Sequence, residues 1–122
     1  MTVSQIDLAP PSGAKQYIND DLDGTISAVK ASSGTLYGLV IDNSANAAAS
    51  YVKLWNTASG SVTVGTTAPD WIFMVPASVK KTFSMPEGIA FGTALSAACV
   101  TTAGTAGTTN PTSNVDVRIT YA

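Results

Sequence analysis

The chain is divided into short segments by clusters of turn residues that recur about every 8 to 12 residues. Between the clusters lie runs rich in valine, isoleucine, threonine and aromatic residues, and no long helical period appears. This pattern is typical of a β-sandwich or a β-barrel. We expect strands over residues 25–31, 35–42, 49–56, 71–75, 79–85, 94–101 and 115–121, and a shorter one over 61–64.

Seven or eight antiparallel strands in about 100 residues favour an all-β fold, an antiparallel two-sheet β-sandwich of the jelly-roll type over residues 23–122. An immunoglobulin-like sandwich is the alternative. Residues 1–22 contain Pro10, Pro11 and Gly13 and show little periodicity. They are therefore expected to form an extended N-terminal arm or a frayed terminus. A chain of 122 residues fits one domain with a core of its own.

The strand expected over residues 71–75 is apolar on both faces. Trp71, Phe73 and Val75 share one face, because successive side chains of a strand point to opposite sides. Ile72 and Met74 share the other face. A strand with one solvated face alternates apolar and polar residues. We therefore expect something besides the protein's own core to cover the face that carries Ile72 and Met74.

Two further segments carry apolar or aromatic residues that are candidates for contacts. Leu36 and Tyr37 begin the run LYGLVI, in which Gly38 indicates a bulge or a close approach of another backbone. Tyr51 and Trp55 share a strand face, which is either core or an exposed aromatic stripe. The candidate contact interface consists of Leu36, Tyr37, Tyr51, Trp55, Trp71, Ile72, Phe73 and Met74.

The charge of the chain argues against several classes of partner. Six lysines and arginines against eight aspartates and glutamates give a net charge of −2, without a basic run, so direct nucleic-acid binding is not expected. No segment approaches the roughly 18 apolar residues of a membrane helix, so a soluble protein is expected. Charged residues make up 11%, against about 25% in typical domains, which suits a protein packed against neighbours.

The residues that carry most enzyme chemistry are missing or isolated, so no catalytic, cofactor or metal site is expected. Histidine is absent, which removes the commonest general base and metal ligand. Residues 19–24, NDDLDG, match the opening of a calcium loop, but Lys30 stands where the twelfth position requires glutamate. A looser calcium site on the aspartates of this segment is the alternative. Cys99, the only cysteine, is expected to be a small buried hydrophobe rather than a reactive thiol.

Three runs of the sequence resemble small jelly-roll virion proteins of tailed bacteriophages. In these proteins an apolar strand ends in Asp-Asn-Ser, a second strand carries an aromatic-rich YVKLW, and a G-T-x-x-P turn precedes a hydrophobic strand. The runs are LYGLVIDNSANAAASYVKLWN, VTVGTTAPDWIFMVPA and MPEGIAFGTALSAACVTTAG, and the likeness extends over about residues 34–102.

The resemblance implies a non-enzymatic capsid cement or decoration protein, a homotrimer that binds the lattice of the major capsid protein and stabilises the head. It also implies a place on the capsid exterior of the virion, after synthesis in the host cytoplasm. The second apolar face of strand 71–75 would then be buried against a neighbouring protomer. A tail, baseplate or fibre-tip jelly roll that binds carbohydrate through Tyr37, Tyr51 or Trp55 is the alternative.

Overall fold

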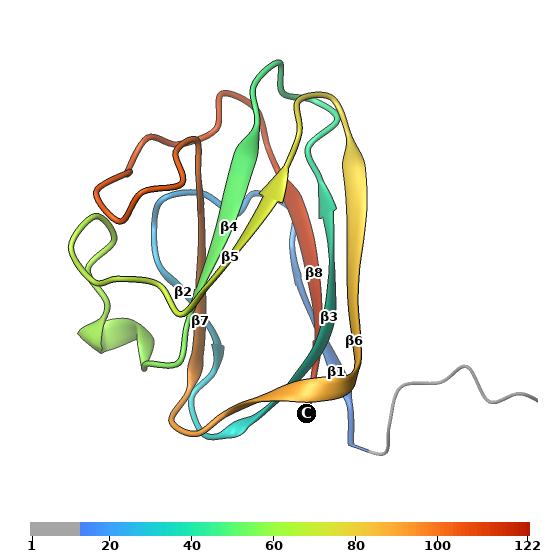
Figure 1. The fold of residues 1–122 in the computed structure, drawn as a ribbon, viewed down its shortest axis with the longest axis vertical. Helices are drawn as coiled ribbons and strands as arrows, with labels where there is room; N and C mark the ends of the chain where they lie inside the picture. The colour runs from blue at the N-terminus through green and yellow to red at the C-terminus, as the bar shows by residue number, and fades with distance from the viewer. Residues whose placement is uncertain (1–12) are drawn as a thin grey trace, which may run out of the picture.

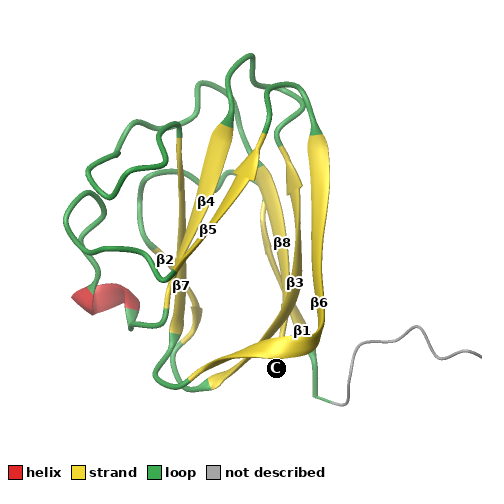
Figure 2. Ribbon diagram, in the orientation of Figure 1, coloured by secondary structure: helices red, strands yellow, loops and turns green. Residues whose placement is uncertain are grey.

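The structure is a computed structural model that describes residues 13–122. Eight strands in this part of the chain form two four-stranded sheets that face each other (Figures 1 and 2). The strands are β1 (Lys15–Asn19), β2 (Ser27–Lys30), β3 (Gly34–Asp42), β4 (Ser50–Trp55), β5 (Trp71–Val75), β6 (Lys80–Phe91), β7 (Leu95–Val100) and β8 (Asp116–Tyr121); a single 3-10 turn, η1 (Ser59–Ser61), follows β4. The predicted all-β sandwich of two antiparallel sheets is confirmed.

The first strand pairs with the last, the second with the next to last, and so on toward the middle of the sequence. Sheet A has the order β1-β8-β3-β6, and sheet B has the order β2-β7-β4-β5. The antiparallel pairs include β1 with β8, β2 with β7, β3 with β6 and β4 with β5. The chain therefore runs as one long antiparallel hairpin that is wound over both sheets.

The predicted N-terminal arm is wrong for its last part. Residues 15–19 form β1, which pairs with β8 from Lys15 opposite Tyr121 to Asn19 opposite Val117. The sandwich therefore begins before the predicted boundary at residue 23, and residues 1–12 of the arm lie outside the described residues. The segment KQYIN was missed because it is mostly polar and follows a proline- and glycine-containing stretch.

Two further strand predictions need correction. The short strand expected over residues 61–64 is absent from the structure, where η1 and a turn occupy this region. Strand β6 continues beyond residue 85 to Phe91, through Pro86. A proline is tolerated there because β6 is an edge strand with one unpaired side.

Gly38 in β3 lies at a bulge, as its position in the sequence predicts. The pairing of β3 with both β6 and β8 shifts register between Leu36 and Gly38. A Cβ atom at Gly38 would lie 2.8 Å from the backbone oxygen of Phe83. Both expectations for this glycine, the bulge and the close backbone approach, are therefore confirmed.

The core lies between the two sheets and is built from their inward-facing apolar rows. Its fully buried members include Leu39 and Ile41 of β3, Val117 and Ile119 of β8, and Val52 and Leu54 of β4. Cys99 of β7 is also buried here, and burial raises the pKa of its thiol to about 12. The thiol therefore stays protonated at neutral pH and packs as a small hydrophobe, as predicted.

One end of the sandwich is held together by two buried asparagines in the connection between β3 and β4. The Asn43 amide nitrogen donates to the carbonyls of Ala48 and Pro76, both at 3.0 Å. Its amide oxygen accepts from Asn46 Nδ2 at 3.0 Å and from Ser50 Oγ at 2.8 Å. These bonds join the β3–β4 connection to the end of β5.

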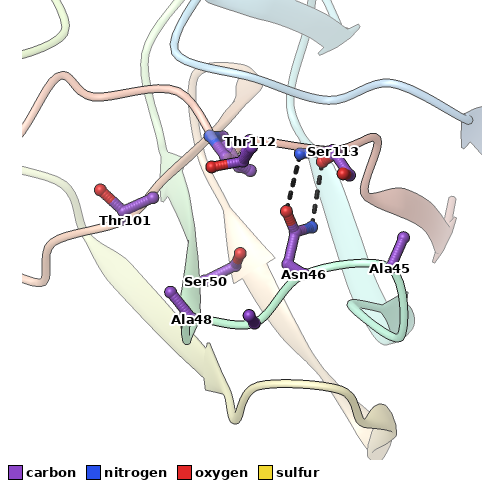
Figure 3. A pocket seen from close by; sticks show the side chains of 9 residues that line it. Ala45, Asn46, Ala48, Ser50, Thr101, Thr112 and Ser113 are labelled. Carbon is purple, nitrogen blue, oxygen red and sulfur yellow. Dashed lines mark hydrogen bonds between the residues drawn. The ribbon is translucent and has the colours of Figure 1, made fainter.

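Asn46 extends this network to the connection before β8. Its Nδ2 donates to the Ser113 carbonyl at 3.0 Å, and its Oδ1 accepts from the Ser113 backbone N–H at 2.7 Å (Figure 3). The Asn46 carbonyl also accepts the backbone N–H of Ser78, which has a positive φ of 61°. Three loops are thus fixed by two side chains.

Leu54→Ala is expected to lower the free energy of unfolding by about 2–5 kcal/mol, because Leu54 is fully buried and the substitution leaves a cavity. Urea unfolding of both proteins measures the difference. The matched control is Ile18→Ala, at a side chain that is 55% exposed, which is expected to cost less than about 1 kcal/mol. Equal losses for the two variants would contradict this placement of the core.

Asn43→Ala is expected to destabilise the fold by at least about 2 kcal/mol, because it leaves several buried polar groups without partners. Thermal and urea unfolding measure the loss. Asn114→Ala, at an exposed position of the same end, serves as the control and is expected to change stability by less than about 0.5 kcal/mol. A nearly neutral Asn43→Ala would mean that water replaces the network.

Candidate interaction surface

The outer face of sheet B is apolar over its centre and is covered there by two long connections of the same chain. Trp55 packs outside the main core with Val62 and Ala98, and with the partly buried Ile26 and Val64. Its indole Nε1 donates to the carbonyl of Thr67 at 3.0 Å. The β4–β5 connection therefore forms a cover over the end of β4 (Figure 1).

Lys53 lies on the same outer face, beneath the connection between β7 and β8. The side chain is 1% exposed, and its Nζ donates to the carbonyl of Gly104 at 2.6 Å. Its register neighbours are Ile72 and Ala98, so apolar side chains flank its stem. Burial lowers the pKa of this ammonium group below its usual value of 10.5.

The cover ends at β5, the edge strand of sheet B. Ile72 and Met74 point to the outer face, and each is 43% exposed. Tyr51, half-buried, lies opposite Met74 on β4. These three side chains form an apolar strip, which we call the β5 strip. The expectation that something besides the protein's own core covers this face stays a prediction, and the two side chains are partly open to solvent in the single chain.

The inner face of β5 packs on the core. Trp71 and Phe73 are partly buried there, and Val75 is fully buried. The rings of Phe73 and Phe83 meet edge to face with centroids 5.0 Å apart, which closes the sandwich between β5 and β6. Trp71 and Phe73 therefore support the edge strand from within and offer only part of their surface to a partner.

The remaining predicted interface residues do not join the β5 strip. Leu36 and Trp55 are buried within the protein, so their prediction as contact residues is corrected. Tyr37 packs over Gly88 of β6 in sheet A, where a Cβ atom would lie 3.0 Å from the Tyr37 ring. The sequence pattern alone does not distinguish Trp55 from Tyr51, because both share one strand face and only the loops decide which is covered.

Sequence reasoning missed one exposed apolar residue. Ile18, 55% exposed, lies on the outer face of β1, opposite Arg118 of β8. It was missed because β1 itself was not predicted. Once β1 is recognised, the alternation of Tyr17 and Ile18 indicates that one of them points outward.

A polar groove of about 390 Å³ lies on the outer face of sheet A. Asp42 and Asp116 are neighbours across β3 and β8, and Arg118 Nε lies 3.5 Å from Asp116 Oδ1. Hydrogen bonds from the Ser44 hydroxyl and backbone N–H, and the nearby Lys80, hold the pKa of Asp42 below its usual range. Asp42 therefore stays ionised, as expected of a solvated surface carboxylate rather than a general acid.

A second hollow, of about 280 Å³, lies beside the asparagine network (Figure 3). Its lining consists mainly of small residues such as Ala45, Ala48 and Thr101. The Asn46 amide at its wall is engaged with Asn43 and Ser113. Within residues 13–122, every buried side-chain nitrogen and oxygen has a hydrogen-bond partner. The polar groups around this hollow therefore serve the fold.

The segment that matches a calcium loop is a pair of side-chain-capped turns. The Asn19 side chain accepts the Asp21 N–H, and the Asp23 side chain accepts the Thr25 N–H. In the part of the chain that the structure describes, no group of three acidic or cysteine side chains is placed to hold a metal ion.

Lys53→Met is expected to raise the free energy of unfolding at pH 7 by about 1 kcal/mol, because it removes the cost of burying an ammonium group. The pKa of Lys53 is lowered in the folded state, so the unfolded chain binds more protons between that pKa and 10.5. The wild type should therefore gain stability with rising pH in this window, and the variant should lose that gain. Urea unfolding at pH 7 to 11 measures both effects.

Lys15→Met, at an exposed lysine, is the control for this experiment and is expected to leave both the stability and its pH dependence unchanged. A Lys53→Met variant that is less stable than the wild type would show that the bond to Gly104 outweighs the cost of burial.

Comparison with known proteins does not assign a role to these surfaces. No helix in residues 13–122 is long and apolar enough to cross a membrane. Compared with protein-family models, with curated proteins and with solved structures, the chain has no match.

Proposed function

We propose that this chain is a non-enzymatic structural protein of a tailed-phage virion, a cement or decoration protein that binds the lattice of the major capsid protein as a homotrimer. The proposal places it on the capsid exterior, after synthesis in the host cytoplasm. The sequence supports this proposal through the resemblance over about residues 34–102. The strand order supports the finer assignment to the jelly-roll type, since β1, β2, β3 and β4 pair with β8, β7, β6 and β5.

The β5 strip is the observation that carries this proposal. Ile72 and Met74 remain exposed on the outer face of sheet B, at its edge strand β5. Neighbouring exposed apolar side chains on a small protein indicate a contact with another protein. The low content of charged residues, 11%, supports a role in which much of the surface meets neighbours.

The groups in the described residues support a binding role rather than catalysis. The chain contains no histidine, and its cysteine is buried and protonated. The carboxylates described above are solvated, capped by backbone N–H groups or near a basic side chain. The proposal therefore assigns no reaction and requires no cofactor.

The alternative, a carbohydrate-binding jelly roll of a tail or fibre tip, has less support. It needs aromatic rings that are free to stack on a sugar. Trp55, its largest candidate, is 1% exposed and uses its indole N–H within the protein. Tyr37 and Tyr51 are half-buried and lie on different sheets. The β5 strip fits protein contact better than sugar stacking.

Purified chain added to capsid shells that lack it, from the phage that encodes it, is expected to bind saturably and to raise the temperature at which the shells come apart. Sedimentation of the shells measures binding, and electron cryo-microscopy is expected to show density for three copies around threefold positions. Shells that already carry the protein are the control. Absence of binding, together with hits on a glycan array, would contradict the proposal and favour the alternative.

A further inference from the structure

Each four-stranded sheet of the sandwich has two edge strands, and three of these four carry features that discourage pairing with another chain. Natural proteins protect such edges with charged residues, prolines, bulges or short strands, because an edge presents unpaired backbone N–H and C=O groups. In the described residues these features are Lys15 in β1; Lys30 and a register shift in the four-residue β2; and Lys80, Lys81, Pro86 and Glu87 in β6.

Strand β5 is the exception among the four edges. Its sequence, WIFMV, has no charge, proline or glycine, and its pairing with β4 keeps one register from end to end. It has no hydrogen-bonded strand on its other side. Pro69 and Pro76 flank it, so a pairing strand would meet a free edge of five residues.

We propose that β5 pairs antiparallel with β5 of a second copy of this chain, about a twofold axis at Phe73. The pair would join the two B sheets into one continuous sheet. The contact is additional to the proposed capsid role and does not depend on it. Two copies of this chain are sufficient to form the contact, without a capsid protein.

The side chains of β5 are suited to pairing with themselves. A twofold contact places the same surface on both partners, so it must be self-complementary. With Phe73 opposite Phe73, Ile72 lies opposite Met74 on the outer face, which brings the β5 strips of two copies side by side. Trp71 then lies opposite Val75 on the inner face. Each cross-strand pair is apolar on both sides.

The charges near β5 are also compatible with this register. Asp70, which precedes the strand and is exposed, lies opposite Pro76 of the second copy. The two Asp70 carboxylates therefore stand at opposite ends of the paired segment, about 20 Å apart at the rise of a β-strand. No like charges meet along the five paired residues, and the buried Lys53 lies one strand away on β4.

A twofold contact gives assemblies with an even number of copies. If the chain is otherwise monomeric, the product is a dimer. If it forms trimers through other surfaces, β5 pairing links one trimer to the next, because an antiparallel pair of identical strands cannot close a ring of three.

Light scattering on the full chain over a range of concentrations tests the contact. The wild type is expected to reach twice the 12.4 kDa chain mass, or six times that mass if trimers form. I72K/M74K places lysines opposite lysines across the axis and is expected to halve the mass and weaken association by roughly tenfold or more. I72K/M74E places opposite charges in the same two rows and is expected to restore the wild-type mass.

Ile18→Lys, at the exposed residue on the outer face of β1, is the matched control and should leave the mass unchanged. Circular dichroism establishes that each variant is folded. A monomeric wild type overturns the inference, as does a wild-type trimer that I72K/M74K converts to monomer. Failure of folded I72K/M74E to restore the mass overturns the proposed register.

The same variants separate this inference from the capsid role. Shell binding that survives in I72K/M74K, while its mass is halved, supports β5 pairing and shows that the shells are bound through surfaces other than the β5 strip. Unchanged mass in I72K/M74K overturns β5 pairing, whatever the shells bind.

Discussion

Sheet B is apolar on both faces, and the rest of the structure depends on how those two faces are covered. Sheet A covers the inner face, and the core between the sheets has the form expected of any sandwich. The outer face has no second sheet. The chain covers it with the connections before β5 and before β8, which close over Trp55 and Lys53.

This arrangement explains why long, polar loops are anchored so firmly. Loops that only join strands are usually solvated. Here the loops shield apolar surface, and each is held by a specific bond to the sheet beneath it, from the Trp55 indole to Thr67 and from Lys53 to Gly104. The asparagine network does the same at the end of the sandwich. The cover stops short of β5, where Ile72 and Met74 stay exposed.

The sequence predicts most strands because their patterns are local. The apolar run 71–75 matches β5 at both ends, and the outer-face residues of this run, Ile72 and Met74, are exposed in the single chain. Strand β1 escaped prediction because a polar five-residue segment is stabilised by pairing with β8, at the far end of the chain. The assignment of Trp55 to the interface failed for a related reason. Periodicity identifies a face of a strand, but it does not identify which distant loop lies on that face.

Pairing from the ends of the sequence inward also determines when the fold can be completed. Strand β8 lies between β1 and β3 in sheet A, yet it is synthesised after the other seven described strands. Until residues 116–121 have left the ribosome, β1 has no neighbour, and the inner faces of β3, β4 and β7 lack part of their cover. Such long-range closure is slow compared with local pairing. A nascent chain of this protein therefore carries exposed strand edges until β8 has been synthesised, when contact with other nascent copies is most harmful.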